Sequence, residues 1–163
     1  MRLPNSVATF AVVLLFAPGA PSAWAGYGDG VAAAKRGDYA TALREFRALA
    51  KRGNPLGQNG LGTMYAKGRG VPLDYVEAAR WYRKAAEQGL ARAQGNLGVL
   101  YQKGRGVSKN EVRAHSWYSL AEAQNIERGA KNREKITRRM TPAQIAEAER
   151  LAHDWKAKHG RKK

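Results

Sequence analysis

The chain has 163 residues, enough for one domain, and it carries 29 Lys and Arg residues against 13 Asp and Glu residues. The resulting net charge of +16 favours solubility and attraction to polyanions, but it does not indicate a fold. Because cysteine is absent, a disulfide scaffold, a cysteine nucleophile and a thiolate metal site are excluded.

Residues 1–25 have the features of a cleaved export signal. Arg2 gives a positive start, residues 7–17 form an apolar run, and Ala23 and Ala25 fit the small-x-small cleavage rule. The run is shorter than the roughly 20 residues that span a bilayer. We therefore expect an exported chain without a transmembrane anchor, in a bacterial periplasm or alternatively outside the cell. An uncleaved signal anchor is the other interpretation of this segment.

A long stretch of the chain occurs twice. Residues 38–73 return as residues 74–109, with about 16 identical positions at a spacing of 36 residues. A third and weaker copy spans residues 110–140. Because a period of 20–50 residues is the signature of a solenoid, we predict a single all-α solenoid domain over residues 26–158.

The first helix of each unit is indicated by apolar residues at helical spacing, as in residues 74–89. Asp74 is placed to cap this helix, and Glu77, three residues later, predicts a capping box. Gly89 stands where the chain leaves the helix with a positive φ. These signals recur: the caps are Asp38, Asp74 and Asn110, and the terminators are Gly53, Gly89 and Asn125.

The second helix is predicted over residues 55–67 and again over residues 91–103. Gly62 and Gly98 occupy one position inside it, although a helical glycine costs about 1 kcal/mol relative to alanine. We interpret the repeated glycine as a close helix crossing that admits no side chain. The small residues expected on the partner helices are Ala42, Ala78 and Ala114.

Both ends of the array are predicted to be helical. Residues 31–34 suggest a short opening helix, and residues 126–140 a last member of the repeat, packed through Ala130, Ile136 and Met140. A capping helix over residues 141–158 should cover the open end. Its expected start is Thr141, Pro142 and Gln144, its apolar face is Ile145, Ala148, Ala152 and Trp155, and the basic tail 159–163 should fray.

Two runs of sequence resemble the Sel-1-like repeat, a variant of the tetratricopeptide repeat. The first is Ala-x-x-Trp-Tyr-Arg-Lys-Ala-Ala-Glu-Gln-Gly from Ala78, and the second is Ala-Gln-x-x-Leu-Gly-x-x-Tyr-x-x-Gly-x-Gly-Val from Ala93. The resemblance covers roughly residues 27–155. It implies a right-handed α-solenoid of antiparallel helix pairs, with the first helix of each pair lining a concave surface. It also implies a function, because members of this family are mostly adaptors that hold protein partners, and many bacterial members are exported.

No catalytic, metal-binding or cofactor-binding constellation is evident, so we expect a protein that is not an enzyme. His115 falls on the inner face of a helix, at the position of Leu43 and Ala79, and we interpret it as partly buried and hydrogen-bonded. His153 and His159 are six residues apart, so they do not share a helix face as metal ligands would.

Two sets of residues are candidates for binding a partner, and each could equally be ordinary solvated surface. The first set lies on the second helices: Asn59, Thr63, Asn96 and Leu100. The second is two basic pairs on one edge: Lys67, Arg69, Lys103 and Arg105. A further basic group is Lys131, Arg133, Lys135, Arg138 and Arg139.

These candidates lead to two hypotheses for a chain that we expect to be monomeric. The first is a protein partner, and the alternative is an anionic envelope polymer or acidic partner attracted by the basic loops. Nucleic acid is the weakest candidate, because no aromatic stacking platform is evident. Trp81 and Trp117 flank the apolar face and are interpreted as packing between units, not as a ligand site.

Overall fold

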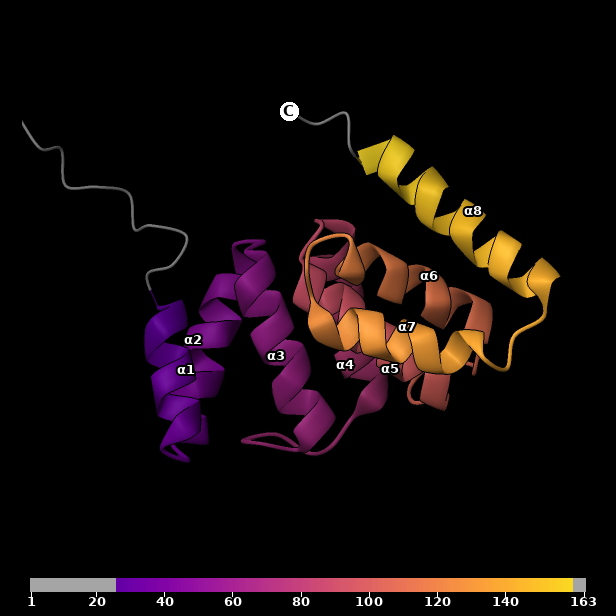
Figure 1. Cartoon of the computed structure of the whole chain (residues 1–163). Coiled ribbons are helices and arrows are strands. Elements are labelled where there is room, and N and C mark those ends of the chain that lie inside the picture. Colours follow the sequence, from indigo (N-terminus) through magenta and orange to yellow (C-terminus); the bar gives the residue numbers. More distant parts are fainter. Residues whose placement is uncertain (1–25, 160–163) are drawn as a thin grey trace, which may run out of the picture.

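The computed structural model describes residues 26–159, so the predicted export signal lies outside the described residues. The described part is all helical, and from α1 to α7 each helix packs against the next one in the sequence (Figure 1). The predicted all-α solenoid of antiparallel helix pairs is confirmed. The helices are α1 (Tyr27–Lys35), α2 (Tyr39–Lys51), α3 (Pro55–Lys67), α4 (Tyr75–Glu87), α5 (Ala91–Lys103), α6 (Glu111–Glu122), α7 (Glu127–Thr137) and α8 (Pro142–His159).

The predicted helix boundaries of the two clear units hold, because their capping residues form the expected contacts. Side chains that accept hydrogen bonds from backbone N–H groups of the first turn are Asp38, Asp74 and Asn110. Residues that turn the chain with a positive φ after α2, α4 and α6 are Gly53, Gly89 and Asn125. The second helices, α3 and α5, begin and end at the predicted residues.

The capping box predicted at the start of α4 is wrong in its second half. Oδ1 of Asp74 accepts from the N–H groups of Val76 and Glu77, at 2.8 and 3.0 Å. The Glu77 carboxylate instead accepts from Arg80 at 3.3 Å. The N–H of Asp74 donates to the carbonyl oxygen of Tyr65 at 3.0 Å. The donor that the box would satisfy is therefore already used to tie the loop back to α3.

The core is built around one large aromatic side chain in the first helix of each unit. Phe46 centres an apolar cluster formed by α1, α2 and α3, whereas Tyr82 and Tyr118 belong to a second cluster that extends from α4 to α8. All three rings are at least nine-tenths buried. Burying such a side chain stabilises the fold by about 1.5–3 kcal/mol.

The close helix crossing predicted from the two glycines is confirmed. A Cβ added to Gly98 would stand 2.6 Å from Cε1 of Tyr118, and one added to Gly62 would stand 2.7 Å from Cδ1 of Tyr82. Each ring belongs to the first helix of the following unit, so the crossing joins one unit to the next. The backbone atoms nearest to these positions are the carbonyl oxygens of Ala78 and Ala114, both at 3.3 Å.

Pairs of glutamines add a polar connection between units. The Gln88 amide donates to Oε1 of Gln58 at 2.8 Å, and the Gln124 amide donates to Oε1 of Gln94 at 3.0 Å. Each of these donors also binds the carbonyl oxygen of the glycine that ends the preceding first helix, at 3.0 and 3.1 Å. Because both pairs recur at the repeat spacing, they fix the register of one unit against the next.

The C-terminal part departs from the prediction in detail. Helix α7 is shorter than predicted, but Ile136 and Met140 are buried as expected. The box at the start of α8 forms: the Thr141 N–H donates to Oε1 of Gln144 at 2.9 Å, and the Gln144 N–H donates to Oγ1 of Thr141 at 3.2 Å. Helix α8 then packs on α6.

The fraying predicted for the start of the basic tail is wrong for His159. This residue is the last of α8, and its ring stacks on Trp155 with centroids 4.3 Å apart. The large flat surface of Trp155 therefore holds the helix end in place. Residues 160–163 lie outside the described residues.

Replacing Gly98 by Ala should destabilise the fold by about 1–3 kcal/mol, because the added methyl group must push the Tyr118 ring away. Gly95 on the same helix is the matched control, since its nearest neighbour would be Cβ of Ala121 at 3.9 Å. Gly95→Ala should stabilise by about 0.5–1 kcal/mol through helix propensity. Urea unfolding measures the free energy of unfolding of both variants. If both variants are stabilised, or both are destabilised, the close crossing at Gly98 is disproved.

Candidate partner-binding cleft

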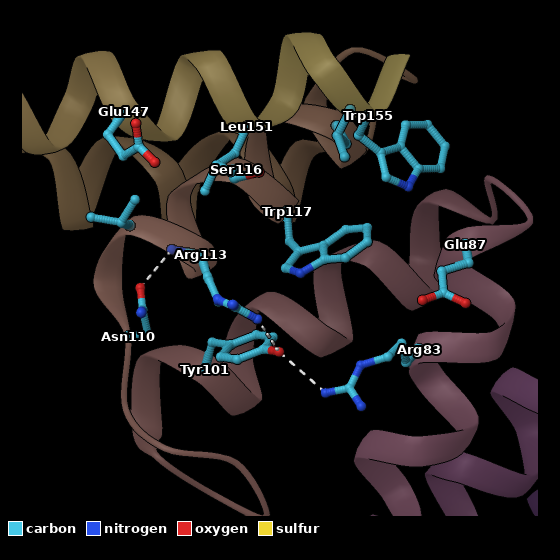
Figure 2. Close-up of a pocket in the computed structure, with 12 residues that line it drawn as sticks. Arg83, Glu87, Tyr101, Asn110, Arg113, Ser116, Trp117, Glu147, Leu151 and Trp155 are labelled. Carbon is cyan, nitrogen blue, oxygen red and sulfur yellow. Dashed lines mark hydrogen bonds between the residues drawn. The ribbon is translucent and has the colours of Figure 1, made fainter. Parts of the chain in front are cut away.

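An open cleft of about 690 Å³ lies between α4, α5, α6 and α8 (Figure 2). Trp117 on α6 and Trp155 on α8 form an apolar wall, with ring centroids 6.3 Å apart in an edge-to-face arrangement. Leu151, one turn before Trp155 on α8, extends the wall. Leu151 and Trp155 therefore reach the cleft because α8 packs on α6.

Opposite this wall, two arginines converge on one phenol oxygen (Figure 2). The hydroxyl oxygen of Tyr101 accepts from Arg83 at 3.1 Å and from Arg113 at 3.4 Å. The Arg113 guanidinium carbon is also 5.7 Å from the centroid of the Tyr101 ring. Burial alone would raise the pKa of the Tyr101 phenol, but the hydrogen bonds and charges of the two guanidinium groups outweigh it and lower this pKa.

The position of Arg113 is fixed by the start of α6. Its backbone N–H donates to the capping side chain of Asn110 at 2.8 Å, so the arginine leaves the first turn of the helix in a defined direction. In the preceding unit the corresponding residue is Glu77, which pairs with Arg80. The second cation is therefore a departure from the repeat, and packing of the units does not require it.

Two carboxylates also line the cleft. Glu147 on α8 is held by Arg150, with oxygen to nitrogen distances of 2.7 and 2.9 Å. Glu87, one turn after Arg83 on α4, is exposed. Among the described residues, neither Arg83 nor Arg113 forms an ion pair with a carboxylate. The cleft thus combines an apolar wall, two cations without a carboxylate partner and two exposed carboxylates, of which Glu147 is paired with Arg150.

The first set of predicted binding residues lies elsewhere and is mostly buried. Leu100 is 4% exposed and Asn59 is 8% exposed. The Asn96 amide donates to Oδ1 of Asn59 at 3.1 Å, and the Thr63 hydroxyl lies 3.0 Å from the hydroxyl of Tyr82. These contacts give Asn59, Thr63 and Asn96 a role in packing one unit on the next, and Leu100 belongs to the apolar core. A role in partner binding stays a prediction, and the half-buried Thr63 and Asn96 are the members with surface to offer.

The two predicted basic pairs repeat as expected. The guanidinium carbon of Arg69 lies 5.3 Å from the centroid of the Tyr39 ring, and that of Arg105 lies 5.0 Å from the centroid of the Tyr75 ring. Lys67 and Lys103 are exposed. The aromatic rings therefore hold the two arginines in equivalent positions, one repeat apart.

The third basic group is largely neutralised within the fold. Lys131 pairs with Glu127 at 2.6 Å, Arg138 with Glu134 at 2.6 Å, and Arg139 with Glu111 at 3.1 Å. Arg133 pairs with Glu122. This group therefore offers less attraction to an anion than its sequence suggests.

His115 is more deeply buried than predicted. Its side chain is fully enclosed, with Nδ1 3.4 Å from Oγ of Ser119 and with Nε2 lacking a hydrogen-bond partner. Burial, and then the charge of Arg133, lower the pKa of His115, whereas Glu149 and Glu122 act in the opposite direction. The histidine is therefore held in its neutral form inside the core.

No three His, Asp or Glu side chains in residues 26–159 gather closely enough to hold a metal ion. None of the described helices combines the length and apolar character that crossing a membrane requires.

Sequence reasoning missed most of the cleft. Trp117 was interpreted as packing between units, which it does, but it also lines the cleft. Arg83, Tyr101 and Arg113 are not among the binding residues that the sequence predicts. The available signal was Arg113, which replaces the acidic residue found one repeat earlier.

Comparison with protein-family models identifies the repeat. The Sel1 repeat model matches residues 55–90 and residues 91–126. Its units have the predicted spacing but begin at α3 and α5, whereas the units predicted above begin one helix earlier. No curated protein matches the chain.

Two solved structures share this architecture. The first is a protective antigen of uropathogenic Escherichia coli strains that displays an SLR fold, with 33% identity and a TM-score of 0.79. The second is a Sel1 repeat protein from Oxalobacter formigenes, with 34% identity and a TM-score of 0.65. The matches cover 84% and 79% of this chain, but the chain spans only 30% and 55% of those structures.

The stability of the fold should fall in mild acid because of His115. The unfolded chain binds a proton at this histidine near pH 6.5, whereas the folded chain resists protonation, so the free energy of unfolding decreases as the pH drops below about 6.5. His115→Leu, which installs the residue of the first unit, should flatten this dependence. Urea midpoints measured between about pH 7 and pH 5 test it.

His153→Gln removes an exposed histidine from α8 and is the matched control. If both variants keep the wild-type dependence of the urea midpoint on pH, the buried His115 is not the source of this dependence.

Proposed function

We propose that this chain, which contains two Sel1 repeats, is a non-catalytic module that holds a protein partner in the cleft between α4, α5, α6 and α8. One observation carries this proposal: the cleft presents Trp117 and Trp155 beside the paired arginines at Tyr101. Trp, Tyr and Arg are the residues that most often dominate binding energy at protein interfaces. Its volume also falls in the range of about 300–1,000 Å³ typical of ligand sites.

A binding role fits the cleft better than catalysis does. No histidine is among the residues that line it, and its described hydroxyl groups are those of Ser116 and Tyr101. The cleft also holds the carboxylates of Glu87 and Glu147, but among the described residues neither is hydrogen-bonded to Ser116, as the base of an activated nucleophile would be. We therefore propose that the protein binds and positions a partner and does not itself catalyse a reaction.

We further propose that the module works in the bacterial cell envelope. The support is the export signal predicted over residues 1–25, which lie outside the described residues. The protective antigen of uropathogenic Escherichia coli is similar in fold, and the chain spans 30% of it.

A second candidate function is the binding of an anionic envelope polymer. It is favoured by Arg69 and Arg105, which are held over Tyr39 and Tyr75 in the same arrangement. In the described residues neither of these arginines, nor Lys67 or Lys103, forms an ion pair. A chain of phosphates could contact both loops in succession.

The proposed function is tested by capture of a partner from envelope extract with tagged residues 26–163. A discrete protein should be retained at low and at physiological salt, since the contact is anchored by apolar side chains. Trp117→Ala should weaken its binding more than about tenfold, as expected for a central aromatic anchor.

Trp81→Ala is the matched control, because Trp81 occupies the equivalent position one repeat earlier and does not line the cleft. Melting curves of both variants show that the fold is retained. A retained protein that binds both variants equally well would rule out the cleft as the binding site.

The polymer alternative predicts a different result. Retention on immobilised lipopolysaccharide should fall steeply as salt is raised, and it should be lost when the four loop cations are changed to Gln. The equal-charge control changes Lys131, Lys135, Arg138 and Arg139 instead. If both sets of changes reduce retention equally, net charge is responsible and the two loops have no special part.

A further inference from the structure

We propose that the cleft selects an extended partner segment in which a single Asp or Glu side chain stands next to a large apolar side chain. This inference rests on the proposed function and adds the chemistry of the ligand. The carboxylate would bind at Arg83 and Arg113, and the apolar side chain would pack against Trp117 and Trp155.

The first step is that Arg83 and Arg113 have more hydrogen-bond donors than their shared acceptor, the Tyr101 hydroxyl oxygen, can satisfy. Arg83 and Arg113 both donate to the hydroxyl oxygen of Tyr101, at 3.1 and 3.4 Å. Each guanidinium group has five N–H donors, and a phenol oxygen can satisfy only a few of them. A carboxylate is a stronger acceptor, because charge-assisted hydrogen bonds are roughly twice as strong as neutral ones. The pair is thus suited to bind one carboxylate.

The second step is that Tyr101 holds the two cations in place before a ligand arrives. Only 7% of this residue is exposed, so its oxygen is a fixed point at the base of the cleft. Arg83 comes from α4 and Arg113 from α6, and the shared oxygen brings the two long side chains together. Preorganised side chains reduce the entropic cost of binding.

The third step is the apolar wall. Trp117 and Trp155 stand edge to face, and Leu151 lies beside them in the same cleft (Figure 2). Successive side chains of an extended segment point to opposite sides, and the arginines lie across the cleft from the tryptophans (Figure 2). An aromatic or large aliphatic neighbour would therefore reach this wall while the carboxylate stays at the arginines.

The fourth step limits the ligand to one carboxylate. Glu87 is exposed at the edge of the cleft, one turn along α4 from Arg83, and would repel a second negative charge. Glu147, on the α8 side, is held by Arg150. A run of acidic residues would place its additional charges beside Glu87, so the cleft differs from a general site for polyanions.

The test follows the indole N–H signals of Trp81, Trp117 and Trp155 by NMR in labelled residues 26–163, which contain all the described helices. The probe is the blocked peptide acetyl-Gly-Ser-Glu-Phe-Ser-Gly-amide. The signals of Trp117 and Trp155 should shift saturably, and that of Trp81 should not move. The same peptide with Gln in place of Glu should bind at least about tenfold more weakly.

Variants locate the carboxylate. Arg113→Gln should weaken binding of the Glu-Phe peptide about tenfold and leave the weak binding of the Gln-Phe peptide unchanged. Arg47→Gln is the equal-charge control, because Arg47 is, like Arg113, an exposed arginine on the first helix of a unit, and it lies outside the cleft. The dispersed spectrum of each variant shows directly that it is folded.

The outcomes separate this inference from the proposed function. Equal binding of the Glu-Phe and Gln-Phe peptides would leave a cleft that binds peptides but would overturn the role of the carboxylate. If acetyl-Gly-Ser-Gln-Phe with a free C-terminus binds more tightly than the Glu-Phe peptide, the site recognises a terminal carboxylate. That result would overturn the proposal that it binds an Asp or Glu side chain. The absence of any shift at Trp117 and Trp155 would overturn the inference, whereas the proposed function fails only if partner capture ignores Trp117→Ala.

Discussion

The structure depends on one contact that recurs between units: an aromatic ring pressed against a glycine of the preceding helix. Tyr82 lies on Gly62 and Tyr118 lies on Gly98, with no space for even a methyl group between them. The contact lets the helices approach closely enough for the neighbouring glutamine amides to form hydrogen bonds. Apolar packing and polar register are therefore set together, at the same boundary between units.

Most of the fold could be predicted because the residues that start, end and pack each helix occur twice in the sequence at the same spacing. A cap, a glycine terminator and a glycine in the second helix fall at equal spacing, so each signal supports the other. The capping box at Glu77 could not be predicted correctly, because the N–H of Asp74 is used by Tyr65 in a preceding helix. The length of α7 was also misjudged, since this unit has lost the residues that mark its ends elsewhere.

The candidate cleft could hardly be predicted from the sequence. It depends on how α8 lies on α6, and the repeat gives no information about a helix that occurs once. Trp155 could be placed on the apolar face of α8, but its proximity to Trp117 required the packing itself. Repetition thus predicts the scaffold, whereas the function that we propose depends on positions where repetition stops, as at Arg113 and in α8.

The glutamine pairs have a consequence for how such a chain can lengthen. Because each amide reaches the unit before it, a duplicated segment keeps these bonds only if a whole unit is copied. The side-chain amide oxygens of Gln58 and Gln94 accept a hydrogen bond from the next unit. The residue at their position in the last unit is Ala130, which has no side-chain amide to accept such a bond. A unit added after α7 would therefore lack this polar connection to its neighbour, whereas a unit copied within the array would keep it.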